Sequence, residues 1–313
     1  AIVACMAIGM NFHPFYFSTG TWMVLVGVYI TIASVTPVWI LLQPRDYLSS
    51  FLLYAMLIVA FIGIIGAHPT IDESVFPAFA GFTVHNANGT QFLFPILFTT
   101  VACGAISGFH SLVSSGTTSK QLDKESDAKP IAYGGMLLEC VLAIITLCAI
   151  GFARVTGHTK GAIDIFAGGI AAMIGAIPGL EGMETIMYTL LVLTYSAFCL
   201  TSLDTATRLA RFMFQEFWLN PGENPKDVKS GFRKLMVNPY FATIITVILG
   251  ISLGMGGFAK IWGLFGAANQ LLAAIGLLAV AAWLGNAGKN NKMFLFPMTF
   301  MLVVTISSLI IIV

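Results

Sequence analysis

The sequence has 313 residues, of which 58% are hydrophobic and only 9% are charged, and its mean hydropathy is +0.90. A chain this apolar is not a water-soluble domain, and most of its surface must face lipid. The formal net charge of +1 excludes the basic field that nucleic-acid binding requires. We therefore expect an all-α polytopic protein of the cell inner (plasma) membrane, with the lipid bilayer as its solvent and no nucleic-acid partner.

Eight runs have, or nearly have, the roughly 20 apolar residues that a membrane-spanning helix needs. They are residues 20–42, 49–66, 91–113, 131–153, 183–203, 237–257, 262–284 and 293–313. Residues 1–10 look like the end of a ninth helix, because the chain starts inside an apolar run without an initiator methionine. We expect one transmembrane domain over residues 1–313 that is incomplete at its N-terminus, with the missing helices absent or on another chain.

Residues 161–178 are apolar but short, and charge asymmetry decides whether they span, because Lys and Arg concentrate in cytoplasmic loops. If they do not span, 12 Lys and Arg residues fall inside and three outside; if they do, five fall inside and ten outside. The first arrangement fits the rule and makes 161–178 an outer helical hairpin. It also predicts cytoplasmic loops at 114–130 and 204–236 and outer loops at 67–90 and 154–182.

The run 94–111 combines Pro95 with glycines and polar side chains inside one predicted span. Interrupted helices of transporters use such residues to expose backbone polar groups to a ligand. The alternative is that two of these glycines form a small-residue contact with another helix. The histidine favours a functional role, because an ionisable ring inside a span is costly. The predicted substrate-binding residues are Gly104, Ser107, Gly108 and His110.

Glu139 is the first candidate for ion coupling, because it lies about 13 Å into its predicted helix. His110, on the preceding antiparallel helix, is its most economical partner, and together they are predicted to help carry a proton or a cation. The alternative is a static hydrogen-bonded pair.

A second candidate cluster for ion coupling consists of Thr201, Ser202, Asp204 and Thr205. At this spacing we expect their oxygen atoms on one side of a helix, which suits a monovalent cation or a relayed proton. The alternative is that Asp204 caps the amphipathic stretch that follows it. Asn269 and Gln270 are the only amides in their span, and we expect them to hydrogen-bond to a neighbouring helix.

Nucleotide, zinc and hydrolase motifs are absent: the sequence has no G-x-x-x-x-G-K-[ST], no H-E-x-x-H and no G-x-S-x-G. We therefore expect no enzyme, no metal site and no cofactor beyond Na⁺ or H⁺ as a coupling ion.

Several long stretches resemble the carbon starvation protein family, CstA. They are LLQPRDYLSSFLLY (41–54), FPILFTTVACGAISGFHSLVSSGTTSKQL (94–122), SAFCLTSLDTATRLARFMFQE (196–216) and GLFGAANQLLAA (263–274). The resemblance implies uptake of peptides or pyruvate during nutrient limitation, driven by an ion gradient. It also implies the later part of an inverted-repeat (LeuT-like, APC-type) transporter fold, with 91–113 as the second broken helix and 183–203 as a cation-bearing helix.

The sequence thus predicts an ion-coupled secondary transporter with a small-molecule substrate. The alternatives are a nutrient-sensing membrane receptor that does not translocate its ligand, and a passive channel. No Lys or Arg lies deep in a predicted span, which disfavours an anion such as pyruvate unless the missing segment supplies a positive charge.

Overall fold

Helices make up most of the computed structural model, and they fall into two compact units. Unit 1 comprises Ala1–Ala78 and Leu137–Ile251, and unit 2 comprises Phe79–Met136 and Ser252–Val313. The predicted end of a ninth helix at 1–10 lies largely outside the described residues. The structure describes residues 7–9, 11–12, 16–74, 77–86, 89–158, 161–225, 227–228, 231–256 and 258–312.

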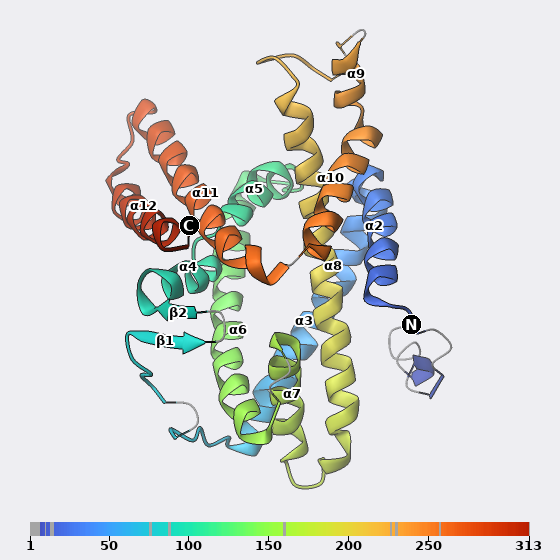
Figure 1. Cartoon of the computed structure of the whole chain (residues 1–313), viewed down its shortest axis with the longest axis vertical. Helices are drawn as coiled ribbons and strands as arrows, with labels where there is room; N and C mark the ends of the chain where they lie inside the picture. The colour runs from blue at the N-terminus through green and yellow to red at the C-terminus, as the bar shows by residue number, and fades with distance from the viewer. Residues whose placement is uncertain are drawn as a thin grey trace. The chain divides into compact units, whose positions relative to one another are not determined.

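Unit 1 is built around α7, which lies beside α3 and α8 (Figure 1). Residues 167–174 of α7 are all buried, and they form the core with residues of α3, α6 and α8. Gly169 permits this packing, because a Cβ there would lie 2.2 Å from the carbonyl oxygen of Ala149 in α6. The helices of this unit are α2 (Thr19–Val35), α3 (Val38–Ala67), most of α6 (Ala128–Thr156), α7 (Ala162–Gly175), α8 (Glu184–Phe217), α9 (Phe232–Val237) and most of α10 (Pro239–Met255).

The predicted boundary between the first two spans is wrong. The sequence placed a loop between residues 42 and 49, but α3 runs without interruption through this segment. The chain breaks instead at Thr36, whose φ of −64° and ψ of 139° are extended. The reason is Pro37, because a proline disfavours helical backbone in the residue before it. Pro44 is accommodated within α3.

Two further predictions about unit 1 need correction. Residues 161–178 contain a single helix, α7, and not a helical hairpin, because the chain turns at Pro178 and Gly179 and then leads through the 3₁₀ turn Glu181–Met183 into α8. At 14 residues α7 is about 21 Å long, shorter than the hydrocarbon layer. The helix predicted to end at 203 continues to Phe217, so the first part of the predicted 204–236 loop is helical.

Unit 2 contains a helix interrupted near its middle and an antiparallel helix pair, α11 and α12 (Figure 1). A two-stranded antiparallel hairpin, with Thr83 opposite Phe92, is an exception to the predicted all-α architecture; its sequence is rich in β-branched and aromatic residues. The elements are β1 (Thr83–Asn86), β2 (Gly89–Phe92), the π-helical η1 (Leu93–Leu97), α4 (Phe98–Val101), the 3₁₀ turns η2 (Ala102–Gly104), η3 (Thr118–Lys120) and η4 (Glu125–Asp127), α5 (Gly108–Gly116), α11 (Phe258–Asn286) and α12 (Lys292–Ile312).

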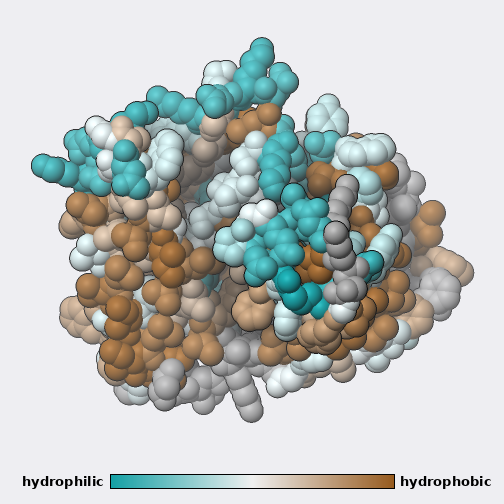
Figure 2. Space-filling model, turned by 90° about the horizontal axis from the view of Figure 1, so that it is seen from above, coloured by the Kyte–Doolittle hydropathy of each residue, from teal (hydrophilic) through white to brown (hydrophobic). Residues whose placement is uncertain are grey.

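The surface agrees with a membrane protein. Figure 2 shows hydrophobic side chains covering broad parts of the visible face, with hydrophilic residues gathered in separate clusters. On α3 alone, Phe51, Ile58 and Phe61 are more than half exposed. Six helical segments of the described chain are long and apolar enough to cross a bilayer: Val38–Ala67, Leu93–Lys120, Glu125–Thr156, Glu181–Phe217, Trp262–Asn286 and Lys292–Ile312. The predicted polytopic helical membrane protein is confirmed, and the apolar helices Thr19–Val35, Ala162–Gly175 and Pro239–Met255 are shorter.

Candidate functional site

The helix that contains the predicted substrate-binding residues is interrupted in unit 2. The backbone N–H groups of Ala105 and Ile106 both donate to the carbonyl of Ala102, at 3.0 and 2.7 Å, and the helix then stops. Ser107 is extended, with φ −120° and ψ 132°, and α5 starts at the next residue. The Ser107 Oγ accepts a weak hydrogen bond from the N–H of His110 at 3.5 Å, as an N-cap residue does.

Asn269 of α11 bridges this interruption. Its Oδ1 accepts a hydrogen bond from the Phe109 N–H at 2.7 Å, in the first turn of α5. Its Nδ2 donates to Ser107 Oγ at 3.2 Å and to Cys103 Sγ at 3.3 Å. One side chain therefore bonds to groups on both sides of the break, and it pairs the Phe109 N–H, which has no partner within its own helix.

Gln270 binds the earlier half of the same interrupted helix. Its Nε2 donates to the carbonyl oxygen of Thr99 in α4 at 3.2 Å. The side chain is fully buried, and no hydrogen bond reaches its Oε1 from the described residues. The interhelical hydrogen bonding predicted for Asn269 and Gln270 is confirmed.

The four predicted substrate-binding residues differ in their surroundings. Ser107 and Gly108 are buried, whereas Gly104 and His110 are exposed within their unit. Gly108 lies directly against α11, because a Cβ there would meet the Asn269 carbonyl oxygen at 2.3 Å and the Ala273 nitrogen at 2.9 Å. Close helix packing therefore explains Gly108 by itself, as the alternative predicted. A role in substrate binding stays a prediction for all four residues.

Asp204, one of the predicted ion-coupling residues, is fully buried within unit 1. Its Oδ2 accepts hydrogen bonds from the guanidinium of Arg45 on α3 and from the hydroxyl of Tyr29 on α2, the latter at 3.0 Å. Arg45 also lies 2.6 Å from the Tyr29 hydroxyl and 3.1 Å from Asp46. Among the described residues no hydrogen bond reaches the second carboxylate oxygen of Asp204. An acid, a base and a phenol from three helices thus form one cluster around the buried Asp204 carboxylate.

This ion pair was not predicted, because Arg45 was expected to lie in a loop. Pro44 and Asp46 made the segment look like a turn, although apolar residues continue on both sides. The uninterrupted α3 carries Arg45 to the side of α8.

The other residues of the predicted coupling cluster do not all share the environment of Asp204. Thr205 is buried and Thr201 half-buried, but Ser202 is exposed, so the four side chains do not line one side of α8. Thr201 donates to the Ala197 carbonyl in its own helix at 3.1 Å. The alternative that Asp204 is a helix cap is wrong, because it lies inside α8, 20 residues after the helix begins.

Two buried arginines in α8 hold the C-terminal end of α2. Arg208 donates to the carbonyls of Ala33 and Thr36, at 2.8 and 2.6 Å, and Arg211 donates to that of Ser34 at 2.7 Å. Carbonyls at a helix end lack partners within the helix and attract positive charge. Arg45, Arg208 and Arg211 therefore lie within helices that are long enough to span, and their guanidinium groups already have partners in the protein.

Glu139 is exposed on α6 and belongs to unit 1, whereas His110 belongs to unit 2. Their predicted relation stays a prediction.

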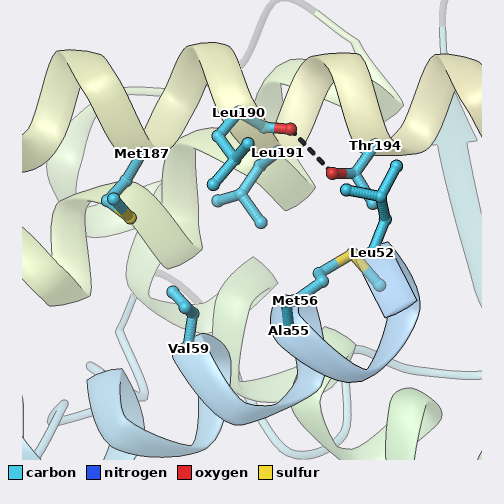
Figure 3. Close-up of a pocket in the computed structure, with 8 residues that line it drawn as sticks. All are labelled: Leu52, Ala55, Met56, Val59, Met187, Leu190, Leu191 and Thr194. Atoms are coloured by element: carbon cyan, nitrogen blue, oxygen red, sulfur yellow. Dashed lines mark hydrogen bonds between the residues drawn. The ribbon is translucent and has the colours of Figure 1, made fainter. Parts of the chain in front are cut away.

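A small apolar pocket lies between α3 and α8 in unit 1 (Figure 3). Its only hydroxyl, on Thr194, donates to the Leu190 carbonyl in the same helix at 2.8 Å. The pocket therefore offers no free hydroxyl donor to a peptide or a carboxylate. Its lining residues are Leu52, Ala55, Met56, Val59, Met187, Leu190, Leu191 and Thr194.

The fold and these polar contacts define a multi-pass helical membrane protein with an interrupted helix and a buried charge cluster. Its sequence matches the model of the carbon starvation protein CstA family over residues 1–156 and 151–308. The chain belongs to this family.

Named relatives agree with that assignment. The peptide transporter CstA of Bacillus subtilis is 33% identical over 83% of this chain and 48% of its own length. The peptide transporter CstA of Escherichia coli is 32% identical over 94% of this chain and 50% of its own length. The pyruvate/proton symporter BtsT of Escherichia coli is 29% identical over 80% of this chain and 44% of its own length. The chain spans about half the length of these relatives, which are named as transporters and not as enzymes. No solved structure matches it.

Proposed function

We propose that this chain is part of an ion-coupled secondary transporter that takes up small organic nutrients, either peptides or pyruvate, across the inner membrane. The observation that carries the proposal is the interruption of a membrane-length helix at Gly104–Gly108, in a family whose named relatives transport peptides or pyruvate. Non-helical backbone at membrane depth is tolerated only where protein or a water-filled cavity surrounds it. Such a break is where transporters place substrates.

The break offers the start of α5 to a carboxylate, which both candidate substrates carry. The N-terminus of a helix attracts negative charge, because its first N–H groups point outward and the helix dipole is positive there. In the structure the Asn269 Oδ1 accepts from the Phe109 N–H. A substrate carboxylate that binds the same N–H replaces a neutral acceptor with a charged one, which strengthens the hydrogen bond. Asn269 then competes with the substrate at Phe109, and Ser107 and His110 flank the bound carboxylate.

Coupling runs through Asp204, with Glu139, Thr201, Ser202 and Thr205 as further candidate groups. A proton or Na⁺ at the Asp204 carboxylate neutralises it and weakens its attraction to Arg45. The contacts between α8 and α3 then respond to ion binding. The similarity to the Escherichia coli pyruvate/proton symporter favours a proton.

The overall arrangement that we propose is the later part of a LeuT-like inverted-repeat fold with eight complete spans. The interrupted helix supports this arrangement. Six helical segments of the described chain are long enough to span, and the apolar helices α2 and α10, with 17 residues each, account for the other two spans if they tilt little or thin the bilayer. The other half of the pathway comes from N-terminal helices or from another chain. Because the named relatives are transporters, they favour transport over the receptor alternative.

Replacing Gly104 with Leu tests the substrate site. Gly104 is exposed at the break, so we expect the variant to reach the membrane but to lose uptake of a labelled dipeptide and of labelled pyruvate in proteoliposomes. The matched control is Gly135→Leu in α6, where a side chain meets no atom within 4 Å, and it should transport like the wild type. Wild-type uptake by Gly104→Leu would remove the substrate site from this segment. Counterflow of either substrate in the wild type distinguishes a transporter from a receptor.

A further inference from the structure

A histidine lies between two carboxylates at one end of unit 1, and three successive elements supply the three side chains. His158 follows the end of α6, Asp164 lies in the first turn of α7, and Glu184 is the first residue of α8. The Nδ1 of His158 is 3.2 Å from Asp164 Oδ1, and its Nε2 is 3.9 Å from Glu184 Oε1. Both titratable atoms of the ring therefore face a carboxylate.

The imidazole is fixed in place by its packing. A Cβ at Gly168 would lie 2.5 Å from the His158 Nδ1, so the ring rests directly on the backbone of α7. The ring of Tyr188 of α8 is nearly parallel to the imidazole, with centroids 6.3 Å apart and the planes 23° from parallel. The Tyr188 hydroxyl donates to the same Asp164 oxygen at 3.3 Å. The side chains of His158 and Asp164 are 27% and 19% exposed. Water therefore reaches both side chains, although packing fixes the position of the ring.

We propose that His158, Asp164 and Glu184 form a proton-binding site that loads the coupling proton of the transporter. The inference rests on the proposed transport function and adds to it a site separate from Asp204. A neutral imidazole has one N–H and can donate to only one of the two carboxylates, whereas an imidazolium has two N–H groups, one for each. Protonation from water therefore completes both contacts and turns them into ion pairs, and deprotonation returns the proton to water.

The location of the site connects the proton to the core of unit 1. The charged and titratable groups that face the ring are Asp164 from α7 and Glu184 and Tyr188 from α8. Arg154 on α6 is exposed, and Lys160 lies outside the described residues. Protonation of His158 strengthens its contacts with Asp164 of α7 and Glu184 of α8, so the end of α6 is held to both helices, of which α7 is the buried centre of the unit. The proton thus acts on a helix that also contacts α3.

The test replaces His158 with Asn, which keeps a donor near the position of Nδ1 but does not titrate. The matched control is His68→Asn at the end of α3, an exposed position with φ 44° that Asn tolerates. In proteoliposomes we expect His158→Asn to retain counterflow of the transported substrate, dipeptide or pyruvate, but to lose at least tenfold in accumulation driven by an imposed pH gradient. His68→Asn should match the wild type. Wild-type gradient-driven accumulation by His158→Asn would overturn the proposal.

A second measurement does not depend on transport. Nuclear magnetic resonance of ¹⁵N-histidine-labelled protein in nanodiscs follows protonation of His158, whose signal is the one that remains when the other four of the five histidines are replaced. At a fixed pH within its titration, we expect the protonated fraction to fall in Glu184→Gln and further in Asp164→Asn/Glu184→Gln. An unchanged fraction in both variants would overturn the proton site, also if His158→Asn fails to fold. If the wild type takes up neither substrate, the proposed function fails, while this titration still decides whether the cluster binds a proton.

Discussion

Removing Arg45 should destabilise the protein more than removing the acid with which it pairs. In Arg45→Met the Asp204 carboxylate stays fully buried and keeps only the Tyr29 hydroxyl as a hydrogen-bond donor among the described residues. Breaking a buried ion pair by removing one partner costs about 3–5 kcal/mol, because the remaining charge is left uncompensated. We expect Arg45→Met to lower the free energy of unfolding by this amount.

The opposite variant, Asp204→Leu, should cost less. The Arg45 side chain is 21% exposed and retains Asp46 at 3.1 Å, so its charge keeps both water and a partner. We expect a loss of about 1–3 kcal/mol, which is the range for an interrupted charged hydrogen bond. The double variant Arg45→Met/Asp204→Leu should recover most of the stability lost in Arg45→Met, because an apolar pair of similar volume replaces a buried ion pair at little cost.

The assay is unfolding of the purified protein in mixed micelles by added sodium dodecyl sulfate, followed by circular dichroism. The control is Arg154→Met on the exposed surface of α6, which should lie within about 0.5 kcal/mol of the wild type. If Arg45→Met is no less stable than Arg154→Met, or if the double variant is no more stable than Arg45→Met, Asp204 does not depend on Arg45 and the reasoning fails.

Gly108→Ala should lower stability by about 1–3 kcal/mol, because its Cβ would fall ~1 Å inside normal contact with the Asn269 carbonyl oxygen and α5 would have to move. The same unfolding assay should find Gly135→Ala neutral or stabilising, and equal effects would contradict the close approach. The N–H of Asn220 and the guanidinium of Arg233 lower the pKa of Glu223 in the loop between α8 and α9. This contribution is present above the ordinary glutamate pKa and is lost as the pH falls through the lowered value. Hydrogen exchange in residues 219–225, corrected for its intrinsic pH dependence, should therefore increase in acid for the wild type but not for Glu223→Gln.

Helices were predictable from the sequence where apolar length alone decides them. The predicted spans 131–153, 262–284 and 293–313 lie within α6, α11 and α12, allowing for one residue at the C-terminus. Helix ends were less predictable, because polar residues do not end a helix when another helix pairs them. Asp204 looked like a terminus and lies inside α8, and Arg45 looked like a loop residue and lies inside α3. Each is accommodated by the other, 159 residues away in the sequence.

The interrupted helix shows which part of a site can be predicted from local sequence. Pro95, Gly104 and Gly108 indicated a segment that cannot form one regular helix, and the chain does leave helical geometry between η2 and α5. The bond from the Phe109 N–H to Asn269 was not predictable in detail, because it depends on the position of α11 beside α5. A lone amide in an apolar span indicates that a polar partner exists, but not which one.

Each of the two charge clusters of unit 1 includes a carboxylate of α8, and the two clusters differ in the base that faces this carboxylate. Glu184 and Asp204 are separated by 20 residues of continuous α8, or about 30 Å, which is the thickness of the hydrocarbon layer. The base that faces Asp204 is an arginine, which stays charged at any physiological pH, so only the carboxylate can exchange a proton there. The base that faces Glu184 is a histidine, whose neutral ring has one N–H and whose protonated ring has two. In the transport cycle that we propose, the proton from water therefore binds at the histidine end of α8, and the Asp204 end responds once its ion pair with Arg45 opens.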